Sequence, residues 1–140
     1  SMGPWLDVGG LVARARRVVH EHFVGLIAHG SMERGEASTS SDVDVLVVVD
    51  RSQPLTRDVY RQWDAEQVEA SGVPVDVHFV QLPESPDRAG SVWCEAAIEG
   101  TVLADTKGRV RCALRDVRRT IGEGRLVRKR AHGQPYWTAA

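Results

Sequence analysis

Three aspartates in two apolar segments are the residues of this sequence whose types and spacing best suit chemistry. Asp42 and Asp44 open the β-branched run 42–49, and Asp76 lies in a similar run, 73–80. Because successive side chains of a strand point to opposite faces, Asp42 and Asp44 share one face. Two carboxylates side by side repel each other unless a positive charge lies between them. No lysine or arginine lies within 42–49, so a divalent cation is the simplest source of that charge.

Magnesium is the cation that these aspartates predict, because Mg²⁺ binds carboxylate oxygens together with substrate phosphates. Three carboxylates from two strands can hold two such ions about 3.5 to 4 Å apart, and this pair stabilises the attacking and leaving oxygens of a phosphoryl displacement. Taken alone, Asp42 could equally be a turn residue at the start of a strand. The three acids together, close to a phosphate-binding segment, favour the metal site.

A second segment, upstream of the aspartates, suits phosphate binding. Gly30 permits a tight turn and a close approach of the backbone, and Ser31 offers a hydroxyl and an N–H group where a helical turn is expected to begin. Free N–H groups and the helix dipole attract phosphate at such a position, and Arg34 is the nearest cation. A Gly-Ser pair alone is more often an ordinary turn. The weight of this pair comes from Asp42, which follows Ser31 after ten intervening residues.

One histidine is expected on the same strand face as a site aspartate. His78 follows Asp76 by two residues and therefore shares its side of the strand. A histidine in a strand more often packs or lies at the surface than takes part in catalysis, so His78 is not included among the predicted site residues.

The elements that must position these residues follow from hydrophobic periodicity and turn residues. Strands are predicted over 23–28, 42–49, 73–80 and 101–104, and helices over 56–70, 88–99 and 110–121, after a first helix that ends near His22. Polar or proline-containing segments at 33–41 and 82–87 are expected to be loops. Trp63 and Trp93 fall at helical core positions. This order predicts an α+β fold with a small mixed β-sheet flanked by helices, and 140 residues suit a single domain.

The composition excludes several classes of protein. The hydrophobic share of 42% and the charged share of 26% are those of ordinary globular proteins. No apolar run approaches the roughly 20 residues needed to cross a bilayer, so we expect a cytoplasmic protein that does not contact a membrane. Cys94 and Cys112 lack C-x-x-C spacing, which indicates reduced, structural thiols rather than a disulfide framework or a zinc site.

Charge is distributed unevenly along the chain. Residues 1–106 contain 8 basic and 17 acidic side chains, whereas residues 107–140 contain 10 basic and 2 acidic ones, a net charge of +8. We therefore divide the chain into a first unit, 3–106, and a basic C-terminal helix and tail, 107–140, packed on that unit or extending from it. Such a tail suits an anionic partner, docking onto the acidic part of its own chain, or a solvated helix face. Tyr136 and Trp137 suit either base stacking or partner contact, or a terminus that folds back.

The segment from Gly30-Ser31 to Asp42-Val43-Asp44 resembles the G-S-x10-D-x-D signature of the DNA polymerase β-like nucleotidyltransferases. Within that superfamily the chain looks most like the minimal nucleotidyltransferases, single domains often encoded beside a HEPN-domain toxin. The resemblance covers about 23–104. It implies a polymerase β-like nucleotidyltransferase fold for 3–106.

The resemblance also implies a role for each matching residue. Gly30 and Ser31 would bind the triphosphate, and Asp42 and Asp44 would bind two Mg²⁺ ions. Asp76 would complete the site and assist deprotonation of the acceptor hydroxyl. The family commonly has a basic residue directly after Gly-Ser, where this chain has Met32 and Glu33, whereas Arg34-Gly35 matches the usual pattern.

The activity implied is magnesium-dependent transfer of AMP from ATP onto a hydroxyl of a macromolecular acceptor. By the resemblance, this acceptor is a HEPN ribonuclease toxin and the chain is the antitoxin that AMPylates it. Two alternatives stay open: a non-catalytic antitoxin or binding module with this fold, and a nucleotidyltransferase that acts on RNA ends, for which the basic tail would contact the backbone.

Overall fold

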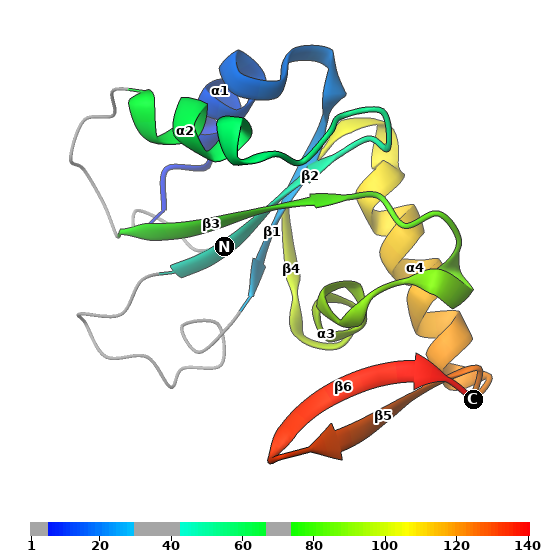
Figure 1. The fold of residues 1–140 in the computed structure, drawn as a ribbon. Coiled ribbons are helices and arrows are strands. Elements are labelled where there is room, and N and C mark those ends of the chain that lie inside the picture. The colour runs from blue at the N-terminus through cyan, green and yellow to red at the C-terminus, as the bar shows by residue number, and fades with distance from the viewer. Residues whose placement is uncertain (1–5, 30–42, 67–73) are drawn as a thin grey trace.

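A mixed four-stranded sheet forms the centre of the molecule (Figure 1). The computed structural model describes residues 6–29, 43–66 and 74–140. The strand order is β3-β2-β1-β4, where β1 pairs antiparallel with β2 and β4, and β2 runs parallel to β3. The strands are β1 (Phe23–His29), β2 (Val43–Val49), β3 (Val75–Gln81) and β4 (Thr101–Asp105). The predicted α+β architecture with a small mixed sheet is confirmed.

Helices cover both faces of this sheet. Figure 1 shows α1 (Val8–Val19) and α2 (Arg57–Ala65) on one side, and α3 (Ser91–Glu99) and α4 (Arg109–Gly122) on the other. Short 3₁₀ turns complete the connections at His20–His22, Pro86–Arg88 and Thr106–Gly108. Each face of the sheet therefore has its own apolar cluster.

The central strand β2 contributes to both clusters, as its apolar sequence predicts. Val45 and Val47 lie in the cluster under α1 and α2, whereas Leu46 and Val48 lie in the cluster under α3 and α4. All four side chains are 0 to 1% exposed. This burial on both faces holds β2 in one register, because a shift by one residue would exchange the residues on its two faces.

The predicted core tryptophans are confirmed, since Trp63 in α2 and Trp93 in α3 are each 5% exposed. Trp63 makes an edge contact with Phe79 of β3, with ring centroids 5.8 Å apart. The indole Nε1 of Trp93 donates to the carbonyl of Gln81 at 2.9 Å. The two tryptophans thus attach β3 to helices on opposite faces.

Glycine is required at one point of β1. A Cβ at Gly25 would lie 2.4 Å from the carbonyl oxygen of Ala104 in β4 and 2.6 Å from Val110 of α4. A backbone carbonyl cannot move aside as a flexible side chain can. The close approach of β4 and α4 to β1 therefore depends on the missing side chain.

Several predicted boundaries differ from the observed ones, three of them by two residues or more. The helix predicted over 56–70 ends at Ala65, where Glu66 adopts an extended conformation and its carboxylate pairs with Arg17; residues 67–70 lie outside the described ranges. The helix predicted from residue 88 begins at Ser91, since a 3₁₀ turn precedes it and Gly90 is its N-cap. The strand predicted over 73–80 is observed from Val75 to Gln81.

The C-terminal segment holds two strands that sequence patterns did not predict. β5 (Leu126–Ala131) and β6 (Gln134–Ala139) form an antiparallel hairpin. Its turn consists of His132 and Gly133, whose φ angles are 51° and 79°. Two positive φ angles are typical of the type I′ turn that joins two-residue hairpins.

The hairpin folds back onto the domain instead of extending from it. Trp137 packs against the cluster under α3 and α4, and its Nε1 donates to Glu95 at 2.6 Å. Arg128 also pairs with Glu95, at 3.3 Å, and Arg125 pairs with Asp87. Part of the basic charge of 107–140 is therefore paired with acids of the preceding residues. Within the described ranges, no helix has the length and apolarity to span a membrane.

Candidate functional site

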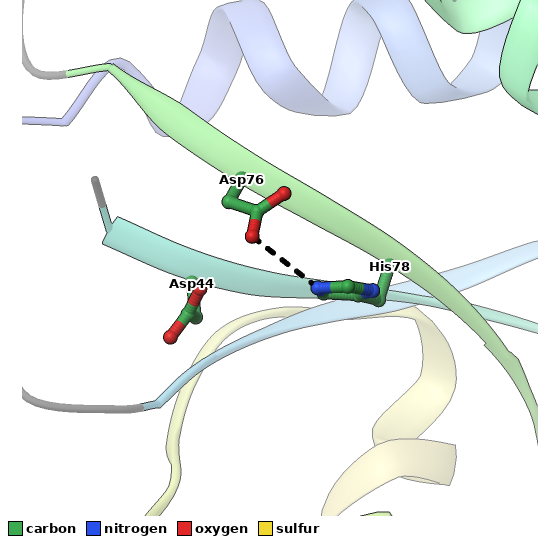
Figure 2. A group of neighbouring side chains, drawn as sticks. All are labelled: Asp44, Asp76 and His78. Atoms are coloured by element: carbon green, nitrogen blue, oxygen red, sulfur yellow. Dashed lines mark ion pairs between the residues drawn. The ribbon is translucent and has the colours of Figure 1, made fainter.

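Asp44 and Asp76 come together at the start of two neighbouring parallel strands. They are direct register partners in the pairing of β2 with β3. Two residues further along β3, His78 lies on the same face, with Nε2 3.4 Å from Oδ2 of Asp76 (Figure 2). One ligand atom from each of the three residues lies within 4.8 Å of the others. We call Asp44, Asp76 and His78 the strand-start cluster.

The cluster lies on the sheet face that α3 and α4 cover only in part. Further along this face, Leu46, Val48 and Val80 belong to the apolar cluster under those helices. At the strand starts, by contrast, the side chains of Asp76 and His78 are 54% and 56% exposed. The polar groups therefore occupy the open part of a face whose remainder is packed.

The buried side of the strands holds the cluster in place. Val43 and Val45, on either side of Asp44, are 1% and 0% exposed. On the other side of β2, the last residue of β1, His29, is the register partner of Asp44. The carboxylate of Asp44 thus projects from a strand that is paired on both edges and packed beneath.

The donor set fits a divalent cation. Two carboxylates and one imidazole are all metal ligands in proteins. Within the described part of the chain, no lysine or arginine forms an ion pair with Asp44 or Asp76, and the ion pair that the cluster does contain is the one between His78 and Asp76. Two carboxylates so close together would be stabilised by a positive ion between them.

The structure brings together two of the six residues that the sequence predicts for the site, Asp44 and Asp76. The other four lie outside the described residues: Asp42, Gly30, Ser31 and Arg34. Two of these are covalent neighbours of site elements, since Gly30 directly follows His29 and Asp42 directly precedes Val43. The roles assigned to all six residues stay predictions.

Sequence reasoning left His78 out of the site. The period-two relation to Asp76 was the available signal, but it cannot tell an open strand face from a packed one. The position of His78 indicates a site residue only once the structure shows that α3 and α4 leave this part of the sheet face exposed.

A second cluster with a histidine and an aspartate lies where β1 begins and β2 ends. His22 Nδ1 lies 3.0 Å from Asp50 Oδ1, and the Ser52 hydroxyl donates to the same carboxylate oxygen at 2.6 Å. Burial acts to raise the pKa of Asp50, but the hydrogen bonds from Ser52 and His22 outweigh it, so the pKa is lowered. Serine and aspartate both face Nδ1, so His22 does not link a serine nucleophile to a carboxylate as a catalytic triad requires. The cluster is structural, because its hydrogen bonds join the start of β1 to the end of β2.

Of the two thiols, the buried one, Cys94, fits the structural role expected for both. Cys94 is fully buried, and burial raises the pKa of its thiol to about 11. A thiol with so high a pKa is almost entirely protonated near neutral pH and is a poor nucleophile. Cys112 is exposed, and both cysteines are free.

Comparison with known proteins identifies the family of this chain. Residues 13–97 match the family model described as a nucleotidyltransferase domain. No curated protein sequence matches the chain. Among solved structures, a toxin-antitoxin with AMP-PNP is 16% identical, with a TM-score of 0.54, and the match covers 86% of this chain and 90% of that one.

Two mutants of the MntA-HpeT toxin-antitoxin are similar as well. They are 14% and 17% identical to this chain, with TM-scores of 0.52 and 0.53. The matches cover 86% of this chain and 90% and 89% of the other chains. At such identities the likeness establishes the polymerase β-like nucleotidyltransferase fold. Since the matching family model spans more than half of the sequence, this chain belongs to the nucleotidyltransferase domain family.

Proposed function

We propose that the chain transfers AMP from ATP onto a hydroxyl group of a macromolecular acceptor. Asp42, Asp44 and Asp76 would be its catalytic and metal-binding residues, and two Mg²⁺ ions would be its cofactor. The observation that carries this proposal is the pairing of Asp44 with Asp76 on an open sheet face, in a chain of the nucleotidyltransferase family.

The proposed reaction is a displacement at the α-phosphorus of ATP. The acceptor oxygen forms a bond to that phosphorus, the bond to the oxygen bridging the α- and β-phosphorus breaks, and pyrophosphate leaves. The acceptor hydroxyl loses its proton to a base, for which Asp76 is the proposed residue. Gly30, Ser31 and Arg34 would bind the triphosphate. Bound Mg²⁺ would neutralise charge on the phosphate oxygens, since metal ions stabilise both the attacking and the leaving oxygen of such displacements.

For the acceptor we propose a HEPN ribonuclease toxin, which makes the chain a cytoplasmic antitoxin. Support comes from the sequence resemblance and from similar folds in structures described as toxin-antitoxin, one of them with AMP-PNP. We further propose that 3–106 carries the transfer chemistry. Residues 107–140 would then act mainly by packing on it, because their hairpin joins the core cluster.

The test is incubation of the chain with α-labelled ATP, Mg²⁺ and the product of the neighbouring gene as candidate acceptor. The parent chain should label the acceptor, whereas Asp42→Ala/Asp44→Ala should not. Glu21→Ala is a matched control, because its side chain is 79% exposed and lies at the opposite end of β1. ATP labelled at the γ-phosphate should leave the acceptor unlabelled, which separates AMP transfer from phosphorylation.

Other results would favour the alternatives. Label transfer that survives the double change would exclude the proposed site. A double variant that still neutralises the ribonuclease would indicate a binding module that acts by occlusion. Label that enters RNA instead of protein would indicate a transferase for RNA ends, and RNA binding should then weaken steeply as salt is raised.

A further inference from the structure

We propose that His78 is a metal ligand beside Asp44 and Asp76, so that the cation at this position is one that accepts nitrogen, with Mn²⁺ preferred over Mg²⁺. The inference rests on the proposed function, because it concerns the cation of the same site. It adds His78 to the three predicted aspartates, and it names the class of metal.

The geometry of the cluster supports this assignment. His78 Nε2 is 3.4 Å from Asp76 Oδ2, and the ligand atoms of all three residues lie within 4.8 Å of one another. Ligands of one ion at bond lengths of about 2.1 Å lie roughly 3 to 4 Å apart. Figure 2 shows the imidazole of His78 and the two carboxylates gathered on one side of β2 and β3. A small movement of exposed side chains would therefore suffice to close them around a cation.

The surroundings of His78 differ from those of a histidine held by protein contacts. His22, at the opposite end of the sheet, is held by Asp50, Ser52 and Glu21. Within the described residues, the ion-pair partner of His78 is Asp76 alone, and its side chain is 56% exposed. Its register partner on β2, Leu46, lies beside it and is buried. The imidazole ring therefore lies on the open part of the sheet face and does not belong to the apolar cluster.

The chemistry of the donors decides which cation is favoured. Mg²⁺ prefers an octahedron of oxygen ligands and gives up its bound water reluctantly, so an imidazole adds little to its binding. Imidazole suits transition metals, and affinity for a mixed nitrogen and oxygen site rises from Mn²⁺ toward the later metals. Mn²⁺ binds oxygen ligands and also accepts a nitrogen ligand. A site of two carboxylates and one imidazole should therefore bind Mn²⁺ more tightly than Mg²⁺.

The experiment uses the full chain with Mn²⁺ and inorganic tripolyphosphate, which avoids the nitrogens of the adenine ring. Electron spin echo modulation of bound Mn²⁺ reports a coordinated imidazole, and protein labelled with ¹⁵N-histidine identifies its source. The parent should show histidine nitrogen coupled to Mn²⁺, and His78→Gln should lose it. His132→Asn is the matched control, since His132 lies in the hairpin turn at φ 51°, a conformation that asparagine tolerates.

Affinities provide a second readout. His78→Gln should weaken Mn²⁺ binding by at least about tenfold, the lower end of the loss caused by removing even a group that only supports a metal ligand. Mg²⁺ binding should change far less. An unchanged melting temperature would show that the variant is folded, as expected for an exposed side chain.

The outcomes separate this inference from the proposed function. Mn²⁺ binding without histidine coupling, or coupling that persists in His78→Gln, would overturn the role of His78 while AMP transfer by the parent stands. Absence of any Mn²⁺ binding to the parent with tripolyphosphate would overturn both. Equal losses of Mn²⁺ and Mg²⁺ affinity would overturn the preference and indicate that His78 acts by orienting Asp76.

Discussion

Charged side chains are arranged differently in the C-terminal region and in the strand-start cluster. In the C-terminal region, 107–140, basic side chains pair with acids of the preceding residues: Arg111 with Asp105, Arg125 with Asp87 and Arg128 with Glu95. In the strand-start cluster, two carboxylates meet, and among the described residues Asp76 pairs with a histidine, His78. Like charge is therefore dispersed into pairs in one region and concentrated in the other.

This difference bears on what each region contributes. Exposed ion pairs are worth about 0 to 1 kcal/mol, so a pair such as Arg125 with Asp87 adds little beyond the packing that it accompanies. Concentrated carboxylates cost stability in the absence of a cation and gain affinity when one binds. Changes in the cluster should thus alter activity without harming the fold, and changes in the C-terminal region should do the reverse.

The largest effect is expected from Asp44→Asn combined with Asp76→Asn. Transfer of AMP should fall by a factor on the order of 10² to 10³, the loss typical when a preorganised electrostatic contact to the transition state is removed. The melting temperature should stay unchanged or rise, because repulsion between the carboxylates is relieved. Transfer rates and thermal unfolding of the same preparations check both parts. A parallel loss of stability would contradict the contrast between the regions.

Trp137→Ala should give the largest effect in the C-terminal region. The free energy of unfolding should fall by roughly 2 kcal/mol, somewhat less than the loss for a fully buried tryptophan, because the side chain is only partly buried. Urea unfolding measures the change, with Tyr136→Ala as control, since Tyr136 is 41% exposed. Transfer per folded molecule should be retained. A strong loss of transfer at full folding would show that the hairpin serves the acceptor as well.

Asp50→Asn sharpens the comparison between the two histidine–aspartate pairs. Because hydrogen bonds lower the pKa of Asp50 in the folded chain, its ionised form stabilises the fold. The variant should lose about 1 kcal/mol at neutral pH, the usual net value of such contacts. The contribution is complete above the ordinary carboxyl pKa and is lost as the pH falls through the lowered value. Urea unfolding from pH 7 to 3 should therefore show parent and variant converging at acidic pH, and a constant difference would refute this origin.

Arg128→Gln should give the smallest effect. Its pair with Glu95 joins side chains that are 43% and 28% exposed, so solvent screens most of the attraction. A loss below about 0.5 kcal/mol is expected, and it should vanish at high salt. Unfolding at low and high ionic strength checks this. A larger loss that is independent of salt would mean that Arg128 stabilises the hairpin by packing its aliphatic stem.

Much of the fold was predictable because it depends on local patterns. The apolar run of β2 predicts a central strand, and Trp63 and Trp93 lie at the core positions that helical periodicity indicates. The hairpin escaped prediction, although His132-Gly133 is a possible two-residue turn. β5 is dominated by exposed basic residues and β6 contains Pro135, so the apolar alternation that normally reveals a strand is weak.

The candidate site also combines features that the sequence predicts with features that only the fold reveals. By itself, the sequence predicted which residues carry chemistry and predicted that Asp42 and Asp44 would share a strand face, because alternation is a property of any extended chain. Only the tertiary structure decided that Asp76 is the register partner of Asp44, that His78 joins them, and that the basic tail pairs with the preceding acids. Register and docking depend on how distant segments fill a shared core, and this is a property of the whole chain.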